Sequence, residues 1–430
     1  MMKMKDSGIE WIGKIPQEYQ VSKIKYISDI FGRIGFRGYT EKDLVDYKED
    51  GAITLSPSNF HDMKMDYTKC SYLSWKKYEE SPEIKIYNGD VLFVKTGSTF
   101  GKAVYVTDLP KEATINPQLV VFKNIKINSK LFSYILQTRI IEIQSELAVL
   151  GSVIPTMSQE KIYNFIISFP PIEEQQAISA YLDEKCTEID SLISELKKQT
   201  EILEEYKRSV IIETVTKGLN PNAQMKDSGI EWIGNIPENW RIHPVYCYFS
   251  ERKNKNSLGL ENNLLSLSYG KIVRKNINSN EGLLPESFNT YNIIEKDDII
   301  IRPTDLQNDK KSLRTAIAKE HGIITSAYIA MMAIKPINSH YFYYLLHSYD
   351  VMKVFYNIGN GVRQGLNFSE FSRLIVFEPT IEEQNEIVSY LDKKCSEIDS
   401  IISEKKRQVK AIEEYKKSFI YEYVTGKKQL

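Results

Sequence analysis

The chain carries two copies of the same segments, and this repeat constrains its fold more than any other feature. The ten residues MKDSGIEWIG occupy positions 4–13 and occur again without a change at positions 225–234. A second pair of segments, 170–216 and 379–425, aligns without gaps and is identical at 29 of 47 positions. Repeats of this length indicate repeated structural units. Each half of the chain therefore opens and closes with shared sequence.

The two middles of the chain, about 14–169 and 235–378, have diverged and share little identity. The offset between the copies is 221 residues at the openers and 209 at the tails, so 221 − 209 = 12 residues of net length difference lie between the repeated segments. Shared ends indicate a shared docking role. Divergent middles indicate that each half recognises something different.

The repeated tails are predicted to be long helices. They lack internal Gly and Pro and are rich in Glu, Lys, Ile and Leu. Each begins just after a proline, with two glutamates in its first turn, where negative charge suits the helix dipole. Apolar residues recur in alternating steps of four and three, which is the period of a coiled-coil seam. The predicted helix–helix seam consists of Leu182, Ile189, Ile193, Leu196, Leu391, Ile398, Ile402 and Ile412.

Two interpretations of the seam stay open at this point. Each helix could pack on its own globular half, or the two helices could bury their seams against each other in an antiparallel pair that holds the halves apart. A 45-residue helix would be roughly 65 Å long. Cys186 and Cys395 lie on the seams and are interpreted as small core residues. Gly and Pro in the linker 217–224 end the first helix.

Each middle contains a predicted β-hairpin with a polar, basic loop. In the first middle, the turn signal Asn88-Gly89-Asp90 precedes two β-branched and aromatic runs that flank the loop 95–102. The segment 295–318 of the second middle has the same strand–loop–strand pattern, with a longer and more basic loop. Arg and Lys suit phosphates and guanine edges, while Asn and Gln can bond adenine. The candidate DNA contacts are Lys95, Thr96, Ser98, Thr99, Lys102, Arg302, Thr304, Gln307, Asn308, Lys310, Lys311 and Arg314.

Either loop could instead be a solvated hairpin tip, but finding such loops at matching places in two diverged halves favours binding. The formal net charge of −1 argues weakly against a nucleic-acid binder. Basic character confined to two faces of the protein would meet this objection. A partner could supply further positive charge.

No catalytic or metal-binding pattern is found in the sequence. The segment GSTFGKA (97–103) has three residues between its glycines and Ala103 after its lysine, whereas a P-loop has four and a Ser or Thr. No Gly-rich cofactor turn, clustered carboxylates or Ser/His/Asp arrangement can be argued. Four scattered cysteines and five scattered histidines predict no metal site. The absence of long apolar runs and of a signal-type start predicts a cytoplasmic chain without membrane spans.

Taken together, these motifs resemble the specificity subunit of type I restriction–modification systems. The resemblance rests on the openers SGIEWIGKIP (7–16) and SGIEWIGNIP (228–237) and on the hairpin GDVLFVKTGSTFGK (89–102). It rests also on SFPPIEEQQAI (168–178) and on the helix ends ETVTKGL (213–219) and EYVTGK (422–427). It spans essentially the full length.

The resemblance implies an α+β fold in which two globular target-recognition domains, 1–169 and 225–378, are separated by two long antiparallel helices, 170–216 and 379–425, in a pseudo-twofold arrangement. Each domain would read one half of a bipartite, asymmetric site in double-stranded DNA. The helices would set the spacer and dock two methyltransferase subunits, and restriction or translocase subunits would join the full complex. The chain itself would be non-catalytic, with S-adenosylmethionine, ATP and Mg²⁺ bound by partner subunits.

The two halves depart from each other where the family pattern closes each domain. The segment Gly151–Pro155 in the first half corresponds to Gly361–Gly365 in the second, where Arg363 and Gln364 are predicted to be additional DNA contacts. Two other functional classes stay open. A self-contained nuclease or methyltransferase would require a metal or cofactor site, and a scaffold whose middles bind protein would suit the neutral net charge.

Overall fold

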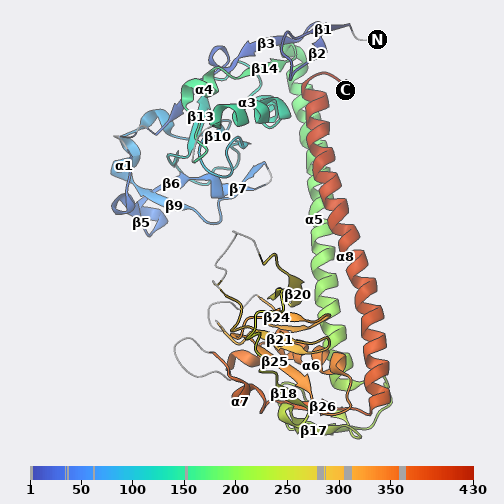
Figure 1. Cartoon of the computed structure of the whole chain (residues 1–430). Coiled ribbons are helices and arrows are strands. Elements are labelled where there is room, and N and C mark those ends of the chain that lie inside the picture. The colour runs from blue at the N-terminus through green and yellow to red at the C-terminus, as the bar shows by residue number, and fades with distance from the viewer. Residues whose placement is uncertain are drawn as a thin grey trace. The chain divides into compact units, whose positions relative to one another are not determined.

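In the computed structural model the two repeated tails are the helices α5 (Ile172–Lys217) and α8 (Ile381–Val424), which Figure 1 shows in green and red. The predicted long helices are thereby confirmed, with ends within two residues of those expected. The structure describes residues 3–430 except 34, 36–37, 62, 151–153, 278–284, 286, 305–311 and 358–364.

The chain divides into two units, and each takes half of each long helix. The first unit comprises residues 1–196 and 407–430, and the second comprises residues 197–406. The first unit thus contains the beginning of α5 and the end of α8, and the second unit contains the end of α5 and the beginning of α8.

The first unit is built on two four-stranded sheets. One is antiparallel with the order β11-β10-β13-β4, and the other has the order β12-β6-β9-β5, in which β12 runs parallel to β6. Two-stranded pairs β1-β2, β14-β3 and β7-β8 flank them. The strands are β1 (Met4–Asp6), β2 (Lys14–Pro16), β3 (Gln20–Lys23), β4 (Asp29–Gly32), β5 (Leu44–Val45), β6 (Gly51–Leu55), β7 (Phe60–His61), β8 (Lys64–Met65), β9 (Ser71–Ser74), β10 (Val91–Val94), β11 (Ala103–Tyr105), β12 (Ala113–Ile115), β13 (Leu119–Lys123) and β14 (Ile166–Phe169). The helices are α1 (Trp75–Glu79), α2 (Ser129–Ile135), α3 (Arg139–Val149) and α4 (Gln159–Tyr163).

The second unit contains an antiparallel sheet of order β18-β25-β22-β23 and the pairs β15-β16, β17-β26, β19-β20 and β21-β24. Its strands are β15 (Met225–Asp227), β16 (Asn235–Pro237), β17 (Arg241–Pro244), β18 (Phe249–Glu251), β19 (Leu265–Ser268), β20 (Lys271–Arg274), β21 (Asn292–Ile294), β22 (Ile299–Ile301), β23 (Thr315–Ile317), β24 (Gly322–Ile324), β25 (Ile329–Ala333) and β26 (Ile375–Glu378). Its short helices are α6 (Ser339–Val351) and α7 (Phe368–Phe371).

The two units share one sheet topology although their sequences have diverged. The order β11-β10-β13-β4 in the first unit corresponds strand for strand to β23-β22-β25-β18 in the second. Parallel pairing of β6 with β12 has its counterpart in a parallel bridge between Leu264 and Ile323. The divergent middles are therefore two versions of one fold.

The repeated residues at the start of each tail attach a globular body to its helix by equivalent hydrogen bonds. Buried Gln175 accepts a bond from the backbone N–H of Asn128 at 2.8 Å and donates to the carbonyl of Pro170 at 2.9 Å. In the second unit, Gln384 makes the same bonds to Asn338 and Pro379 at 2.9 and 3.0 Å. The repetition of these residues thus has a structural cause.

Contacts between the two long helices also repeat, with the roles of α5 and α8 exchanged. In the first unit Lys416 of α8 pairs with Asp190 of α5, and in the second unit Lys207 of α5 pairs with Asp399 of α8 at 2.6 Å. These pairs make the helices antiparallel neighbours, as expected. Six of the predicted seam residues are buried, and Ile189 and Ile412 are half-buried.

The main core of each unit includes residues of both long helices. Leu182 and Cys186 of α5 join Phe419 and Val424 of α8 in the first core, next to the β10 and β13 side chains. Val210 and Val215 of α5 join Leu391 and Cys395 of α8 in the second. All four cysteines are free thiols. None of the helices in the described part of the chain combines the length and apolar character that crossing a membrane requires.

Candidate nucleic-acid interface

The first predicted hairpin is confirmed, and backbone hydrogen bonds hold its loop at the base. Antiparallel pairing of β10 and β11 sets Phe93 opposite Ala103, which leaves residues 95–102 as the connecting loop. The backbone N–H of Lys95 donates to the carbonyl of Gln118 at 2.9 Å, and the N–H of Gly97 donates to that of Pro155 at 3.0 Å. Gly97 adopts φ +102°, a region open to glycine but costly for other residues. The loop is therefore presented in a defined conformation.

This loop brings five of the predicted contact residues together. The side chains of Ser98 and Lys102 are exposed, while those of Lys95, Thr96 and Thr99 are partly buried. Among the described residues, no carboxylate forms an ion pair with either lysine. Two cations and three hydroxyls on an eight-residue loop form a surface suited to the phosphates and base edges of DNA.

Lys95 has an unusual electrostatic setting. Partial burial of its ammonium group lowers the pKa of Lys95 from the ordinary value, and no neighbouring carboxylate acts in the opposite direction. A desolvated cation without an anionic partner gains from a phosphate brought next to it. Lys95 is thus the residue of this loop whose environment most clearly favours an incoming anion.

The second predicted hairpin is also confirmed at its base. Strands β22 and β23 pair with Ile299 opposite Ile317, and the N–H of Arg302 donates to the carbonyl of Arg314 at 2.8 Å. Arg302 is half-buried and Thr304 is exposed at the described start of the loop. The predicted contacts Gln307, Asn308, Lys310 and Lys311 lie outside the described residues, as do Arg363 and Gln364.

The prediction that Arg314 contacts DNA is wrong for this structure. Arg314 has 0% exposed surface, and its guanidinium donates from Nη1 to the carbonyl of Thr304 across the loop base. A side chain without exposed surface cannot reach a groove. Arg314 instead holds the two ends of the loop together.

The residue that anchors this loop from inside, Asp350, is not indicated by any local sequence pattern. Asp350, at the end of α6, is fully buried, and its carboxylate accepts bonds from the backbone N–H groups of Arg314 and Thr315. Burial raises the pKa of Asp350, while these hydrogen bonds act in the opposite direction. Asp350 lies 36 residues from Arg314 in the chain, so no local pattern could have linked them.

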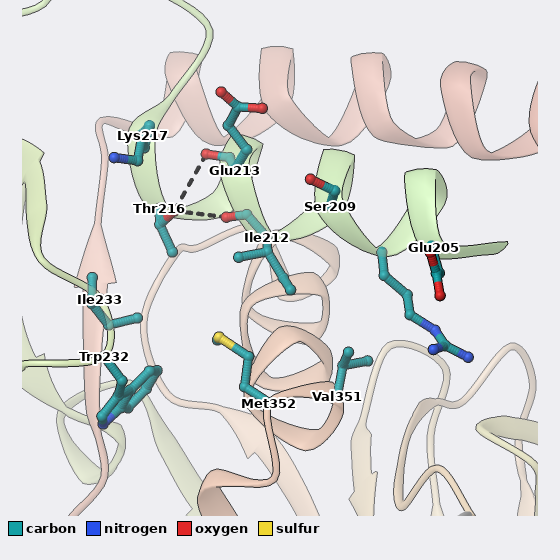
Figure 2. A pocket seen from close by; sticks show the side chains of 11 residues that line it. Glu205, Ser209, Ile212, Glu213, Thr216, Lys217, Trp232, Ile233, Val351 and Met352 are labelled. Carbon is teal, nitrogen blue, oxygen red and sulfur yellow. Dashed lines mark hydrogen bonds between the residues drawn. The ribbon is translucent and has the colours of Figure 1, made fainter. Parts of the chain in front are cut away.

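The second unit also contains a pocket of about 620 Å³ between the end of α5, the repeated opener and the end of α6. Figure 2 shows the apolar side chains of Ile212, Val351 and Met352 directed into it, with Trp232 at one side. The hydroxyl of Thr216 is already used, since it donates to the Ile212 carbonyl at 2.7 Å. Within the described parts of the chain, no group of three or more His, Cys, Asp or Glu is placed to hold a metal ion.

The sequence of this chain is similar to those of known proteins. The family model of the type I restriction modification DNA specificity domain matches residues 16–203. The putative type I restriction enzyme MjaX specificity subunit of Methanocaldococcus jannaschii is 27% identical over 431 residues, covering 97% of this chain and 95% of that protein. The type I restriction enzyme MjaVIII specificity subunit of the same organism is 25% identical over 362 residues, 80% of each chain.

A solved structure supports the fold. A chain from a study of complex assembly and conformational transition of the type I R-M system superposes with a TM-score of 0.66. The superposition covers 96% of this chain and 99% of the other at 14% sequence identity. Similarity at this level of identity shows that the two chains share a fold.

Proposed function

We propose that this chain, which belongs to the specificity subunits of type I restriction–modification systems, is the sequence-specific DNA-recognition subunit of such a complex. Each globular half reads one half of a bipartite, asymmetric site. The first half uses the loop between β10 and β11, and the second uses the loop between β22 and β23.

The main support for this proposal is that the two units share one sheet order but have different loops at the same position of that sheet. Both units place a hairpin at the same position of the same four-stranded sheet order. The loops differ in length and residues: KTGSTFGK (95–102) in one, and a longer loop, 302–314, in the other. Keeping the framework while changing the loop is what two independent readers of unrelated half-sites require.

Local charge is consistent with DNA as the ligand despite the formal net charge of −1. Lys95, Lys102 and Arg302 provide cations that form no ion pair with any residue in the described part of the chain, the first two in the first unit and Arg302 at the described start of the second loop. Phosphate contacts need a locally basic surface rather than a basic protein.

We assign the docking of two methyltransferase subunits to the long helices. Equivalent apolar side chains of the repeat stay exposed on both: Leu192 and Ile401 are each 47% exposed, and Tyr206 and Tyr415 are 48% and 54% exposed. The first unit carries Leu192 and Tyr415, and the second carries Ile401 and Tyr206. Two copies of one surface suit two copies of one partner. In this proposal the helices also set the spacer between the half-sites.

In this proposal the chain is non-catalytic, and its partner subunits catalyse the reactions. S-adenosylmethionine would bind the methyltransferase subunits, while ATP and Mg²⁺ would serve restriction or translocase subunits of a full complex. The support is that the residues gathered on the first loop are lysines and hydroxyls, which suit the binding of phosphates and base edges.

The test is reconstitution. The purified chain alone should bind duplex DNA weakly, in a salt-sensitive way, and should not cleave it. Adding its methyltransferase partner should give tight protection of a two-part site in a footprint. A reconstituted complex that methylates adenine without regard to sequence would rule out the proposed function. Tight binding of S-adenosylmethionine by the lone chain would favour an enzyme instead.

A further inference from the structure

The β19–β20 hairpin of the second unit has an unusual turn. Strands β19 and β20 pair with Ser268 opposite Lys271, so the turn consists of two residues, Tyr269 and Gly270. Their φ angles are +47° and +75°. Two positive φ angles are the pattern of a type I′ turn, in which Asn-Gly is favoured. A tyrosine at the first position is sterically disfavoured, because its Cβ crowds the backbone in the left-handed region.

Packing does not compensate for this strain. Tyr269 is 81% exposed, and within the described part of the chain its ring stacks on no other ring and its hydroxyl makes no hydrogen bond. An exposed aromatic side chain contributes little burial to stability. Strain that persists without a packing benefit points to a role outside the folding of the unit.

The turn lies against the proposed reading loop. A Cβ added to Gly270 would be 2.9 Å from Cβ of Leu313, which immediately precedes Arg314. The backbone N–H and the guanidinium of Arg314 are both bound within the unit, and β20 packs against β23. The hairpin tip is therefore held beside the end of loop 302–314 by a close, glycine-dependent contact.

The same hairpin carries exposed positive charge. Lys271 follows the turn directly, and Lys275 follows the end of β20; both are exposed, and neither forms an ion pair with a described residue. Arg274 differs, since Glu320 binds its guanidinium at 2.8 and 2.9 Å. An exposed ring next to an unneutralised lysine combines apolar contact with phosphate binding.

We propose that the tip of the β19–β20 hairpin is a second DNA-contacting element of the second unit. Tyr269 packs against base edges of the second half-site, and Lys271 binds a flanking phosphate. This inference rests on the proposed DNA-recognition function and adds two residues to its reading surface. Apolar and hydrogen-bonding contacts at base edges in a groove of duplex DNA give sequence preference.

Among the described residues of the first unit, the turn of the corresponding hairpin carries no aromatic side chain, which confines the expected effect to one half-site. The hairpin that packs beside β11 there is β7-β8, and its turn contains Met63 at φ +71°. Met63 is partly buried against the main core of that unit. Its side chain thus contributes to packing, whereas that of Tyr269 does not.

The experiment uses the full chain assembled with its methyltransferase partner. Tyr269→Asn places the residue that type I′ turns favour at the strained position. Binding is measured on a duplex with the complete site that the complex methylates, and on duplexes in which either half-site is scrambled. The variant should bind the target about tenfold more weakly, the loss expected for one base-pair contact in a duplex site, and its discrimination against a scrambled second half should fall while that against a scrambled first half is kept. Its Tm should rise by about 2 °C, because strain is relieved.

Two further variants sharpen the result. Tyr246→Asn removes another exposed tyrosine of the same unit, 53% exposed, and should leave binding unchanged. Lys271→Ser should make the negative slope of log K against log salt shallower by about 0.9, the value for one phosphate contact.

The other outcomes would overturn the hairpin proposal, its strain argument or the proposed function. Unchanged affinity of Tyr269→Asn overturns the proposal, and a lower Tm overturns the strain argument that supports it. Weaker methyltransferase binding with unchanged half-site discrimination would assign Tyr269 to a protein contact and also overturn it. A wild-type complex that shows no preference for the target duplex defeats the proposed function itself, whereas a wild-type preference that Tyr269→Asn retains in full defeats the hairpin proposal alone.

Discussion

Removing the two lysines of the β10–β11 loop should weaken DNA binding without destabilising the protein. Lys102 is exposed, and Lys95 is partly buried with its pKa lowered by that burial alone. Neither forms an ion pair among the described residues. The free protein therefore bears the desolvation of Lys95, and a DNA phosphate would offset it. Lys95→Met should leave the free energy of unfolding unchanged or raise it by up to about 0.5 kcal/mol.

The magnitude on DNA follows from two lost phosphate contacts. A charge-assisted hydrogen bond contributes about 1.5–3 kcal/mol when its partner is desolvated, and less at an exposed site. The double variant Lys95→Met/Lys102→Ser should lose roughly 2–3 kcal/mol, or about 30- to 150-fold in affinity. The slope of log K against log salt should become shallower by about 1.8.

The assay is a titration of the methyltransferase-assembled chain with labelled target duplex between about 50 and 200 mM salt. Methylphosphonate linkages that neutralise phosphates in the first half-site should abolish the effect of the lysine substitutions, while the same linkages in the second half-site should add to it. Lys126→Ser is the matched control, since this exposed lysine follows β13 at the end remote from the loop. The assignment of these lysines to phosphates of the first half-site would be refuted by an unchanged slope of log K against log salt. It would also be refuted if methylphosphonates in either half-site changed the effect of the lysine substitutions equally.

Three further predictions concern the framework of the units. Arg314→Leu should lower the free energy of unfolding by about 3 kcal/mol, because it removes a fully buried group that holds the loop base; a denaturation midpoint equal to wild type would contradict this. Gln384→Ala should cost about 2 kcal/mol, because it leaves the N–H of Asn338 and the carbonyl of Pro379 without their partner, and Gln175→Ala should cost a similar amount in the first unit; the reasoning fails if either variant melts like wild type. Burial, with smaller contributions from Lys207 and Arg208, lowers the pKa of His347 to about 4. The unfolded chain protonates this histidine below about pH 6.5, whereas the folded protein does so only near pH 4. The free energy of unfolding therefore falls as the pH drops from about 6.5 toward 4. The free energy of unfolding of the wild type should therefore fall by roughly 2 kcal/mol more than that of His347→Phe between pH 6.5 and 4. Acid-unfolding curves that run parallel for the two proteins would contradict this prediction.

Local sequence patterns predicted the elements whose causes are local. The 3.5-residue repeat of apolar side chains identified α5 and α8 to within two residues. The turn signal Asn88-Gly89 marked the start of β10, and the Gly-containing loop 95–102 between two apolar runs identified the β10–β11 hairpin. Pairings set by distant residues, such as β12 beside β6, carry no comparable signal.

The candidate site was predictable in place but not in every residue. A basic loop residue has the same one-letter code whether it is exposed, as Lys102 is, or fully buried, as Arg314 is. Burial of Arg314 depends on Asp350, which approaches from another helix. The Tyr269-Gly270 turn was missed because tyrosine is not a turn-forming residue, so its strain is visible only in the backbone angles.

Mapping the adenines that the assembled complex methylates, with wild-type chain and with Lys102→Ser and Tyr269→Asn, tests the central claim most directly. Two independent readers predict a motif of two fixed half-sites around an unspecified spacer of constant length. They also predict that Lys102→Ser weakens methylation of targets through the first half-site alone, and that Tyr269→Asn relaxes the second half alone. A single uninterrupted motif, or loss of both halves together in either variant, would contradict it.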